Sequence, residues 1–161
     1  MESFQEIFKT YYKKIYCFLL KLSGNETLAE ELAQETLYKA FLHIEQFQGR
    51  CSLYTWLCEI GKNEWLLECR RQKHFSKTEQ NPENKEGDSP EQEVLKKQLL
   101  EIMRQEIRNL PNPYQDVIVL RVYAELTYKE IAGKYRKTES WAKVTFFRGK
   151  AMLAERMEGY R

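Results

Sequence analysis

Residues 110–150 have the sequence LPNPYQDVIVLRVYAELTYKEIAGKYRKTESWAKVTFFRGK, and this stretch decides the fold. Asn112 and Pro113 predict the start of a helix, because Asn is a good N-cap and proline at the first helical position needs no N–H. On periodicity alone, the apolar run 117–120 fits a buried strand as well as a buried helix. The proline start and the helical signals on both sides favour a helix.

Two further helix starts follow in the same stretch. Thr127 and Glu130 form a capping box, in which each side chain accepts a hydrogen bond from the other residue's backbone N–H. Thr138 starts another helix so soon afterwards that the helix between them must be short. Ala142 and Phe146 share the inner face of this last helix. The stretch therefore ends in a predicted helix-turn-helix.

Positive charge is concentrated on this helix-turn-helix. Residues 134–150 contain six Lys or Arg and one acid, Glu139, whereas the whole chain has a formal net charge of only +2. A basic helix with small polar residues near its N-terminus suits the DNA major groove. A solvated basic face on an ordinary helical hairpin is the alternative, and the clustering of charge favours DNA binding.

Length and composition exclude several classes of protein. With 161 residues, the chain can hold one domain or two small ones. No apolar run approaches the length of a membrane span, and the first ten residues contain acids where a signal peptide needs positive charge, so we expect a cytoplasmic protein. The cysteines match no metal-site spacing, which favours reduced thiols, with no metal and no cofactor. They are Cys17, Cys51, Cys58 and Cys69.

Two helices open the chain. The first begins at Ser3 and Glu6, another capping box, and ends at the turn 23–25. The second covers about 26–46, with Phe41 among its predicted inward residues. Its outer side begins with acids, which suit a helix N-terminus and also fit a basic partner. Ordinary solvated surface is the alternative for this acidic side.

A loop and a long helix follow. The loop covers 47–51, and Ser52 then caps a helix over 52–75 whose far end is basic. Aromatic rings and cations around a glycine-containing loop suit single-stranded nucleic acid, because bases stack on rings while cations follow the backbone. For Trp56 and Trp65, each taken alone, plain packing in the core is the alternative.

Residues 76–89 differ in composition from their surroundings. They have no large apolar side chain and contain proline and glycine as breakers, which predicts a flexible linker. A helix restarts at Pro90 with an apolar stripe. The sequence therefore predicts an all-α protein of two small helical domains, 1–75 and 90–161, joined by this linker.

Four segments carry a family resemblance. Residues 29–41, 47–57, 60–63 and 126–132 have the sequences AEELAQETLYKAF, FQGRCSLYTWL, IGKN and LTYKEIA. The first resembles region 2.2 of the extracytoplasmic-function (ECF) sigma factors, which belong to the sigma-70 family. The second and third resemble regions 2.3 and 2.4. The fourth, with Leu110-Pro111, Val119-Leu-Arg121 and Lys143 around it, resembles region 4.

The resemblance implies a dissociable RNA polymerase subunit that directs promoter-specific initiation. Its implied partners are core RNA polymerase (the β′ clamp helices and the β flap), promoter DNA and an anti-sigma factor, which in this family is commonly membrane-bound. No small-molecule substrate is implied. The resemblance assigns polymerase docking to Glu31, Gln34, Glu35 and Tyr38. It assigns binding and melting of the −10 element to Phe47, Gly49, Arg50, Ser52, Trp56, Lys62, Asn63, Arg70 and Arg71. It assigns the −35 element to Lys137, Thr138, Ser140, Trp141, Lys143, Val144, Arg148 and Lys150.

The chain departs from the family pattern in the helix-turn-helix. Arg136 stands where a glycine is usual, and glycine suits a turn with positive φ, so an altered or strained turn is expected. Lys137 replaces an apolar residue and Trp141 a small one, while Thr145 replaces a residue that is often basic. We expect Trp141 either to pack against the turn or to touch a thymine methyl group. These changes concern the promoter sequence rather than the fold.

Two other functions compete with the sigma-factor interpretation. A helix-turn-helix regulator that acts without polymerase would need a dimer interface and a ligand pocket in its N-terminal half. That half is already explained by an acidic helix and a basic aromatic one. A recombinase-type enzyme would need a nucleophile, but the serines at 3, 23, 52 and 89 lie at helix starts or loops and are explained as caps.

Overall fold

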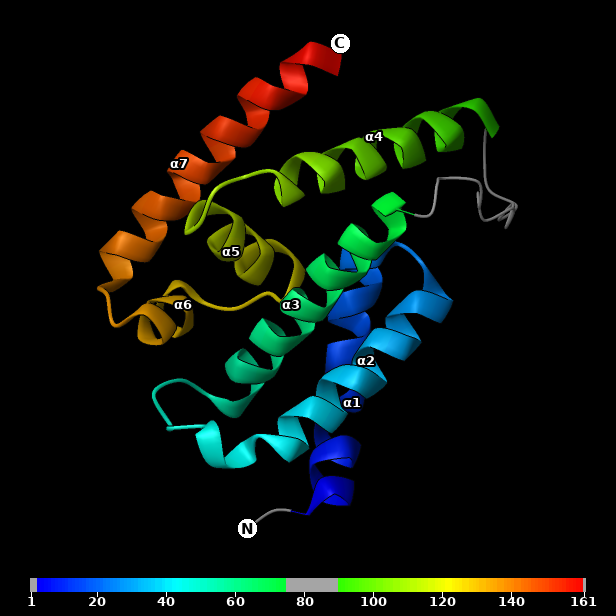
Figure 1. The fold of residues 1–161 in the computed structure, drawn as a ribbon. Coiled ribbons are helices and arrows are strands. Elements are labelled where there is room, and N and C mark those ends of the chain that lie inside the picture. The colour runs from blue at the N-terminus through cyan, green and yellow to red at the C-terminus, as the bar shows by residue number, and fades with distance from the viewer. Residues whose placement is uncertain (1–2, 75–89, 161) are drawn as a thin grey trace.

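A computed structural model describes residues 3–74 and 90–160, and every regular element within these ranges is a helix (Figure 1). The predicted all-α class is therefore confirmed for the described part of the chain. The predicted linker, 76–89, lies outside the described residues. No helix in the described ranges is long and apolar enough to cross a membrane.

The N-terminal unit consists of α1 (Phe4–Ser23), α2 (Glu26–Leu42), a short 3-10 turn η1 (Ile44–Gln46) and α3 (Leu53–His74). Both halves of the Ser3–Glu6 capping box are present, as predicted. Gly24 ends α1 in the left-handed conformation with φ +70°, which glycine adopts without strain. The side chain of Asn25 then caps α2.

The second helix differs from its prediction at one end. It ends at Leu42 instead of Gln46, and η1 replaces its last turn. The prediction that Phe41 points inward was wrong, because this side chain is exposed. Its ring contacts the ring of Phe4 in an edge-to-face arrangement. The core of the unit lies deeper, where α1 supplies Ile15, Phe18, Leu19 and Leu22.

The C-terminal unit begins with α4 (Pro90–Arg108) and α5 (Tyr114–Ile118), which continues as a π-helical turn, η2 (Val119–Tyr123). All four residues of the run 117–120 are buried in these two elements, which confirms helix rather than strand. Gln115 donates from its side chain to the carbonyls of Ile107 and Arg108, so α5 is tied to the end of α4. The N-terminal half of α4 leaves its apolar stripe exposed, at Val94, Leu95, Leu99 and Leu100.

A helix-turn-helix follows, made of α6 (Tyr128–Tyr135) and α7 (Glu139–Met157), with a 3-10 turn, η3 (Glu158–Tyr160), at the end. The predicted capping box of Thr127 and Glu130 is complete, and the Thr138 side chain accepts from the backbone N–H of Trp141. Arg136 lies between the helices in the left-handed conformation, with φ +55°. The turn thus keeps the positive φ that glycine would supply, so of the two expected outcomes the structure has the strained turn and not the altered one.

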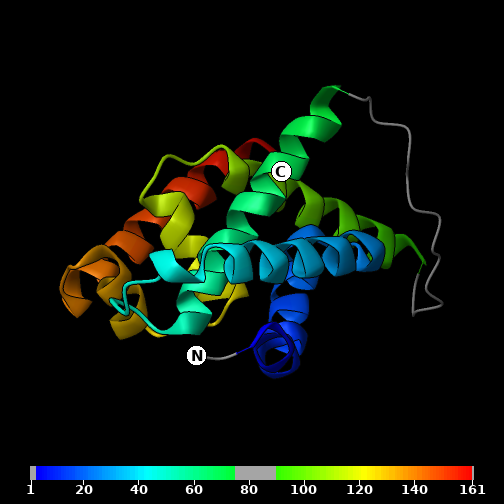
Figure 2. The same cartoon turned by 60° about the horizontal axis from the view of Figure 1, so that its bottom comes forward.

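The two units pack against each other along α3. In both views of the fold, α3 lies between the α1–α2 pair on one side and α5 and α6 on the other (Figure 1, Figure 2). α3 lies close to α6 and to η2, and α1 lies close to η2, although these segments are far apart in the sequence. One helix therefore positions surfaces of both units.

Candidate nucleic-acid interface

The first candidate surface is the outer face of the helix-turn-helix. Seven of the eight predicted −35 residues are exposed there. They are Lys137, Thr138, Ser140, Lys143, Val144, Arg148 and Lys150. Ala142 and Phe146 are buried on the opposite face, as predicted, and seat α7 on the unit. The basic groups therefore point away from the core, where a DNA backbone could reach them.

The eighth residue, Trp141, has a packing role. Its ring lies 5.1 Å from the Tyr135 ring, centroid to centroid, at a tilt of 50°. Trp141 thus packs against the end of α6 next to the turn, which is the first of the two positions expected for it. Phe147 is a residue that sequence reasoning missed: it is 51% exposed, close to Val144 at 47%. Its three-residue spacing from Val144 on a helix was the available signal.

The second candidate surface begins at the loop before α3. Phe47 packs on Trp56 with 5.3 Å between ring centroids, and Arg50 is exposed. Gly49 has φ +71°, and a Cβ added to it would meet no heavy atom within 4 Å, so open space adjoins the loop. The hydroxyl of Ser52 accepts from the backbone N–H of Thr55 at 3.1 Å, which makes Ser52 the cap of α3.

A stripe of side chains along α3 extends this surface from the loop toward the end of the helix. Trp56, Asn63 and Arg70 follow one another at intervals of seven residues. They therefore lie on one face of the helix, with about two turns between each residue and the next. Asn63 and Arg70 are exposed and Trp56 is half-buried. The stripe thus offers a ring, an amide and a guanidinium in line, the groups that stack on bases and pair with base edges or phosphates.

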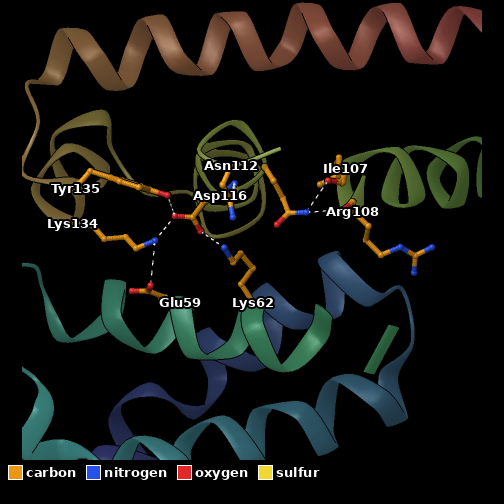
Figure 3. A network of polar contacts seen from close by, with 9 residues as sticks. Glu59, Lys62, Ile107, Arg108, Asn112, Asp116, Lys134 and Tyr135 are labelled. Atoms are coloured by element: carbon orange, nitrogen blue, oxygen red, sulfur yellow. Dashed lines mark hydrogen bonds and ion pairs between the residues drawn. The ribbon is translucent and has the colours of Figure 1, made fainter. Parts of the chain in front are cut away.

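Lys62, next to that stripe, faces the other way. It is only 5% exposed, and its Nζ donates to Oδ1 of Asp116 at 2.5 Å (Figure 3). Lys134 and the hydroxyl of Tyr135 donate to the other carboxylate oxygen of Asp116. Lys134 also pairs with Glu59 at 3.5 Å. We call these five side chains the latch cluster.

Electrostatics in the latch cluster favour the charged carboxylate. Burial by itself raises the pKa of Asp116, but the ammonium groups of Lys134 and Lys62 outweigh it and hold the pKa below its ordinary value. Burial, followed by the charge of Asp116, raises the pKa of Tyr135, so its hydroxyl remains a donor. Asp116 therefore stays ionised between two lysines at neutral pH.

The third candidate surface is the acidic side of α2. Glu31, Gln34, Glu35 and Tyr38 are all exposed and share one helical face. A groove of about 290 Å³ lies along this face, between α2 and α3. Its acidic lining also includes Glu64 and Glu68 of α3, which sequence reasoning missed. Arg71, predicted to bind the −10 element, lines this groove instead of the Trp56–Asn63–Arg70 stripe.

Comparison with known proteins decides the family. The family model for sigma-70 region 2 matches residues 7–75, and the model for sigma-70 region 4 matches residues 100–153. The RNA polymerase sigma factor YlaC of Bacillus subtilis is 30% identical, over 97% of this chain and 92% of its own length. The chain belongs to the ECF sigma factors of the sigma-70 family. The ECF sigma factor SigW of the same bacterium is 28% identical, over 97% of this chain and 89% of its own.

Solved structures have the same fold. CnrH, solved in complex with the cytosolic domain of CnrY, has a TM-score of 0.58 at 16% identity and covers 97% of this chain and 88% of its own. The sigma factor RpoE of Bartonella quintana, solved in complex with the anti-sigma factor NepR, has a TM-score of 0.54 at 20% identity, covering 98% of each chain. As an alternative sigma factor, the protein directs transcription initiation and is not an enzyme of the classical kind.

Within this sigma factor, α1–α3 correspond to the region 2 match, and α5, α6 and most of α7 fall within the region 4 match. The regulator that acts without polymerase is not favoured. Asp116 and Tyr135 are the functional candidates that were hardest to find from the sequence. For Asp116 the signal was a lone acid beside the apolar run 117–120. The exact boundaries 1–75, 76–89 and 90–161 stay a prediction.

Proposed function

We propose that this sigma factor divides its work among its three exposed surfaces. The acidic face of α2 binds the β′ clamp helices of core polymerase. The loop 47–52 and the α3 stripe hold the opened −10 element, and the outer face of α7 recognises the −35 element. One observation supports this division above all. Each of the three surfaces carries exposed side chains with the charge or aromatic character that its partner requires.

The docking surface fits a basic helix. Its acids come from two helices, with Glu31 and Glu35 on α2 and Glu64 and Glu68 on α3 along one groove. Lys39 pairs with Glu35 at 3.9 Å and also with Glu64, so part of this charge is neutralised inside the protein. Glu31 lies two turns before Lys39 on α2, outside these two pairs, which makes it the stronger candidate for attraction to a partner.

The −10 surface fits unpaired bases better than duplex DNA. A half-buried ring such as Trp56 gives a base a stacking face, while Asn63 and Arg70 provide a base-edge or phosphate contact. Gly49 and the free N–H groups at the start of α3 allow close approach of a phosphate. Holding an extruded base in this way offsets the few kcal/mol that unstacking costs.

The −35 surface combines base and phosphate contacts. Lys143 and Arg148 are both exposed on α7, and we assign base contacts to them. Lys137 and Lys150 are assigned to phosphates. Lys150 lies 5.6 Å and 5.8 Å from the ring centroids of Phe146 and Phe147, which limits its reach and suits a backbone contact.

Regulation and location belong to the same proposal. Both solved relatives were captured with a protein partner, the cytosolic domain of CnrY in one case and the anti-sigma factor NepR in the other. We assign this sigma factor an anti-sigma partner and a place in the cytoplasm, where polymerase and promoter DNA are. Its C-terminal unit is also the part we expect to meet the β flap.

A polymerase pull-down followed by run-off transcription tests the proposal. The wild-type chain should bind core polymerase and give promoter-dependent transcripts. Glu31→Lys/Glu35→Lys should weaken binding, because charge reversal adds repulsion to lost attraction, while helical content stays the same. Glu155→Lys/Glu158→Lys, on the exposed end of the chain, is the matched control and should bind as the wild type does. Equal binding by both pairs would reject the docking surface.

A further inference from the structure

The turn between α6 and α7 contains a strained residue. Arg136 ends α6 with φ +55° and ψ +41°, a left-handed conformation in which a Cβ crowds the backbone and glycine has no such contact. The backbone N–H of Arg136 donates to the carbonyl of Gly133 at 3.3 Å, and that of Lys137 donates to the carbonyl of Ala132 at 3.0 Å. These two bonds complete a Schellman motif, in which glycine is the usual residue at the position of Arg136. The turn thus requires this backbone conformation but not this side chain.

Neighbouring residues hold the strained conformation in place. Tyr135 directly precedes Arg136. Its hydroxyl donates to Asp116 (Figure 3), and its ring packs on Trp141 with 5.1 Å between centroids. Two residues after Arg136, the side chain of Thr138 caps α7. Strained residues persist where the surrounding structure determines their conformation in this way, so the Cα–Cβ bond of Arg136 has a fixed direction.

The side chain of Arg136 has no role within the described fold. It is exposed, and within residues 3–74 and 90–160 its guanidinium has no hydrogen bond, ion pair or ring contact. Glu125, the other non-glycine residue with positive φ in these ranges, pairs with Lys21 at 3.2 Å. Attraction to the C-terminal end of α6 does not require Arg136, because Lys134 already lies in the last turn. The strain at Arg136 therefore points to a partner outside these residues.

The position of Arg136 suits a DNA phosphate. In helix-turn-helix complexes the recognition helix lies in the major groove, with its N-terminal residues at the base edges, while the preceding helix crosses the DNA backbone. Arg136 lies between these two helices and so at the edge of the groove, next to the phosphates. Lys137, which is also exposed, occupies a position of the Schellman motif that is frequently apolar. Both turn positions thus carry a cation instead of the residue that stabilises such a turn.

We propose that Arg136 binds a backbone phosphate of duplex DNA beside the −35 element, in addition to the contacts assigned to Lys137 and to α7. This inference rests on the proposed role of the −35 surface. A guanidinium can donate two parallel hydrogen bonds to one phosphate, so arginine supplies both charge and a defined geometry. Phosphate contacts position a protein on the duplex without reading its sequence. Arg136 therefore adds affinity and orients α7 in the groove, and it does not select bases.

Salt-dependent binding of the full chain tests the phosphate contact. The assay is fluorescence anisotropy with a duplex taken from a promoter that the holoenzyme transcribes. Each phosphate contact adds about 0.9 to the steepness with which log affinity falls against log salt concentration. We expect Arg136→Gly to have a slope that is less steep by this amount. Its disadvantage relative to the wild type should then shrink about threefold between about 50 and about 200 mM salt.

Two further variants serve as controls in the same assay. Arg136→Lys keeps the charge and should keep the slope of the wild type. Lys97→Gln removes one charge from the exposed N-terminal half of α4, which lies far from the turn in both views (Figure 1, Figure 2). It should have the slope and the affinity of the wild type. A slope for Arg136→Gly equal to that of Lys97→Gln would overturn the proposal.

Urea unfolding of the same variants separates this role from a structural one. Arg136→Gly removes the strain in the turn, so its urea midpoint should be higher than that of the wild type although its affinity for DNA is lower. A residue that only supported the fold would show lower values of both when replaced. A lower urea midpoint for Arg136→Gly would therefore contradict the proposal.

One more variant separates this inference from the proposed function. Lys143→Ala should weaken binding through α7 itself. If Lys143→Ala weakens binding and Arg136→Gly keeps the wild-type slope, the contact at Arg136 is wrong and the −35 surface stands. If neither variant changes binding, the −35 surface is wrong as well. Across a panel of promoter variants, Arg136→Gly should weaken binding to every member alike, and a loss confined to one position would show that Arg136 reads a base instead.

Discussion

Gly149 lies where α7 crosses α5. The contacts at this position determine how much the substitution Gly149→Ala should lower the free energy of unfolding. A Cβ at this position would lie 2.9 Å from Cδ1 and 3.2 Å from Cγ1 of Ile118, and 3.4 Å from Cβ of Tyr114. Ile118 is 2% exposed, so its side chain has little room to move away. Gly149→Ala therefore pushes α7 away from α5.

Two effects of opposite sign decide the outcome. Alanine inside a helix is favoured over glycine by about 1 kcal/mol. Overpacking a filled core costs about 1–3 kcal/mol. We expect a net loss of about 1 kcal/mol in the free energy of unfolding. Ile118→Val alone should cost about 0.5–1.5 kcal/mol, but it removes Cδ1, the atom nearest to the new methyl group. The double variant should then be more stable than the sum of the single losses, by about 1 kcal/mol.

Native-state hydrogen exchange of the α5 and α7 amides is the assay, because it reports opening of these helices separately from the N-terminal unit. Affinity for a −35 duplex gives a second readout, which should fall in Gly149→Ala and recover in the double variant as α7 returns toward α5. Losses that add within about 0.3 kcal/mol would refute the reasoning, since additivity means that the methyl group does not meet Ile118.

Three further predictions concern function and pH. Alanine at both Arg50 and Asn63 should leave polymerase binding and the closed complex at the −35 element largely intact but reduce permanganate-reactive thymines near the start site; normal melting would place strand opening elsewhere. Lys143→Ala should lower affinity by about 1–3 kcal/mol at one promoter position, whereas Lys150→Ala should weaken all variants of a promoter panel alike, and identical profiles would show that the two roles are not divided. Asp116 has a lowered pKa when folded, so its stabilisation is complete above its unfolded value and disappears as the pH falls through the folded one; the difference in urea midpoint between wild type and Asp116→Asn should shrink below about pH 4, and a constant difference would contradict the charged carboxylate.

Features that depend on neighbours in the sequence were predictable. The capping boxes at Ser3 and Thr127 formed as expected, because each needs only residues three positions apart. The exposure of the predicted docking residues followed from helical period in the same way. At Arg136 the sequence indicated a turn that usually needs positive φ, but it left open whether arginine would alter that turn or adopt the strained conformation.

Features that depend on packing between distant segments were not predictable. The burial of Lys62 results from Asp116, which is 54 residues away in sequence. Nothing local distinguishes Lys62 from its exposed neighbour Asn63 except the helix face, and the sequence does not say what covers that face. Periodicity likewise predicts the apolar stripe of α4, but it does not predict that Leu95 is exposed. The spacing of apolar residues shows that a helix has an apolar face and does not show which segment packs against that face.

The three faces of α3 constrain which insertions and deletions the helix can accept. One faces α2 and the docking groove, one carries Trp56, Asn63 and Arg70, and one supplies Lys62 to the latch cluster. A single inserted residue turns everything downstream by about 100°, so each face would take the place of the next. An insertion of seven residues would nearly restore the phase but lengthen the helix by about 10 Å, which separates the ends of every stripe. Length variation among relatives should therefore be absent from α3 between Trp56 and Arg70, even where individual side chains differ.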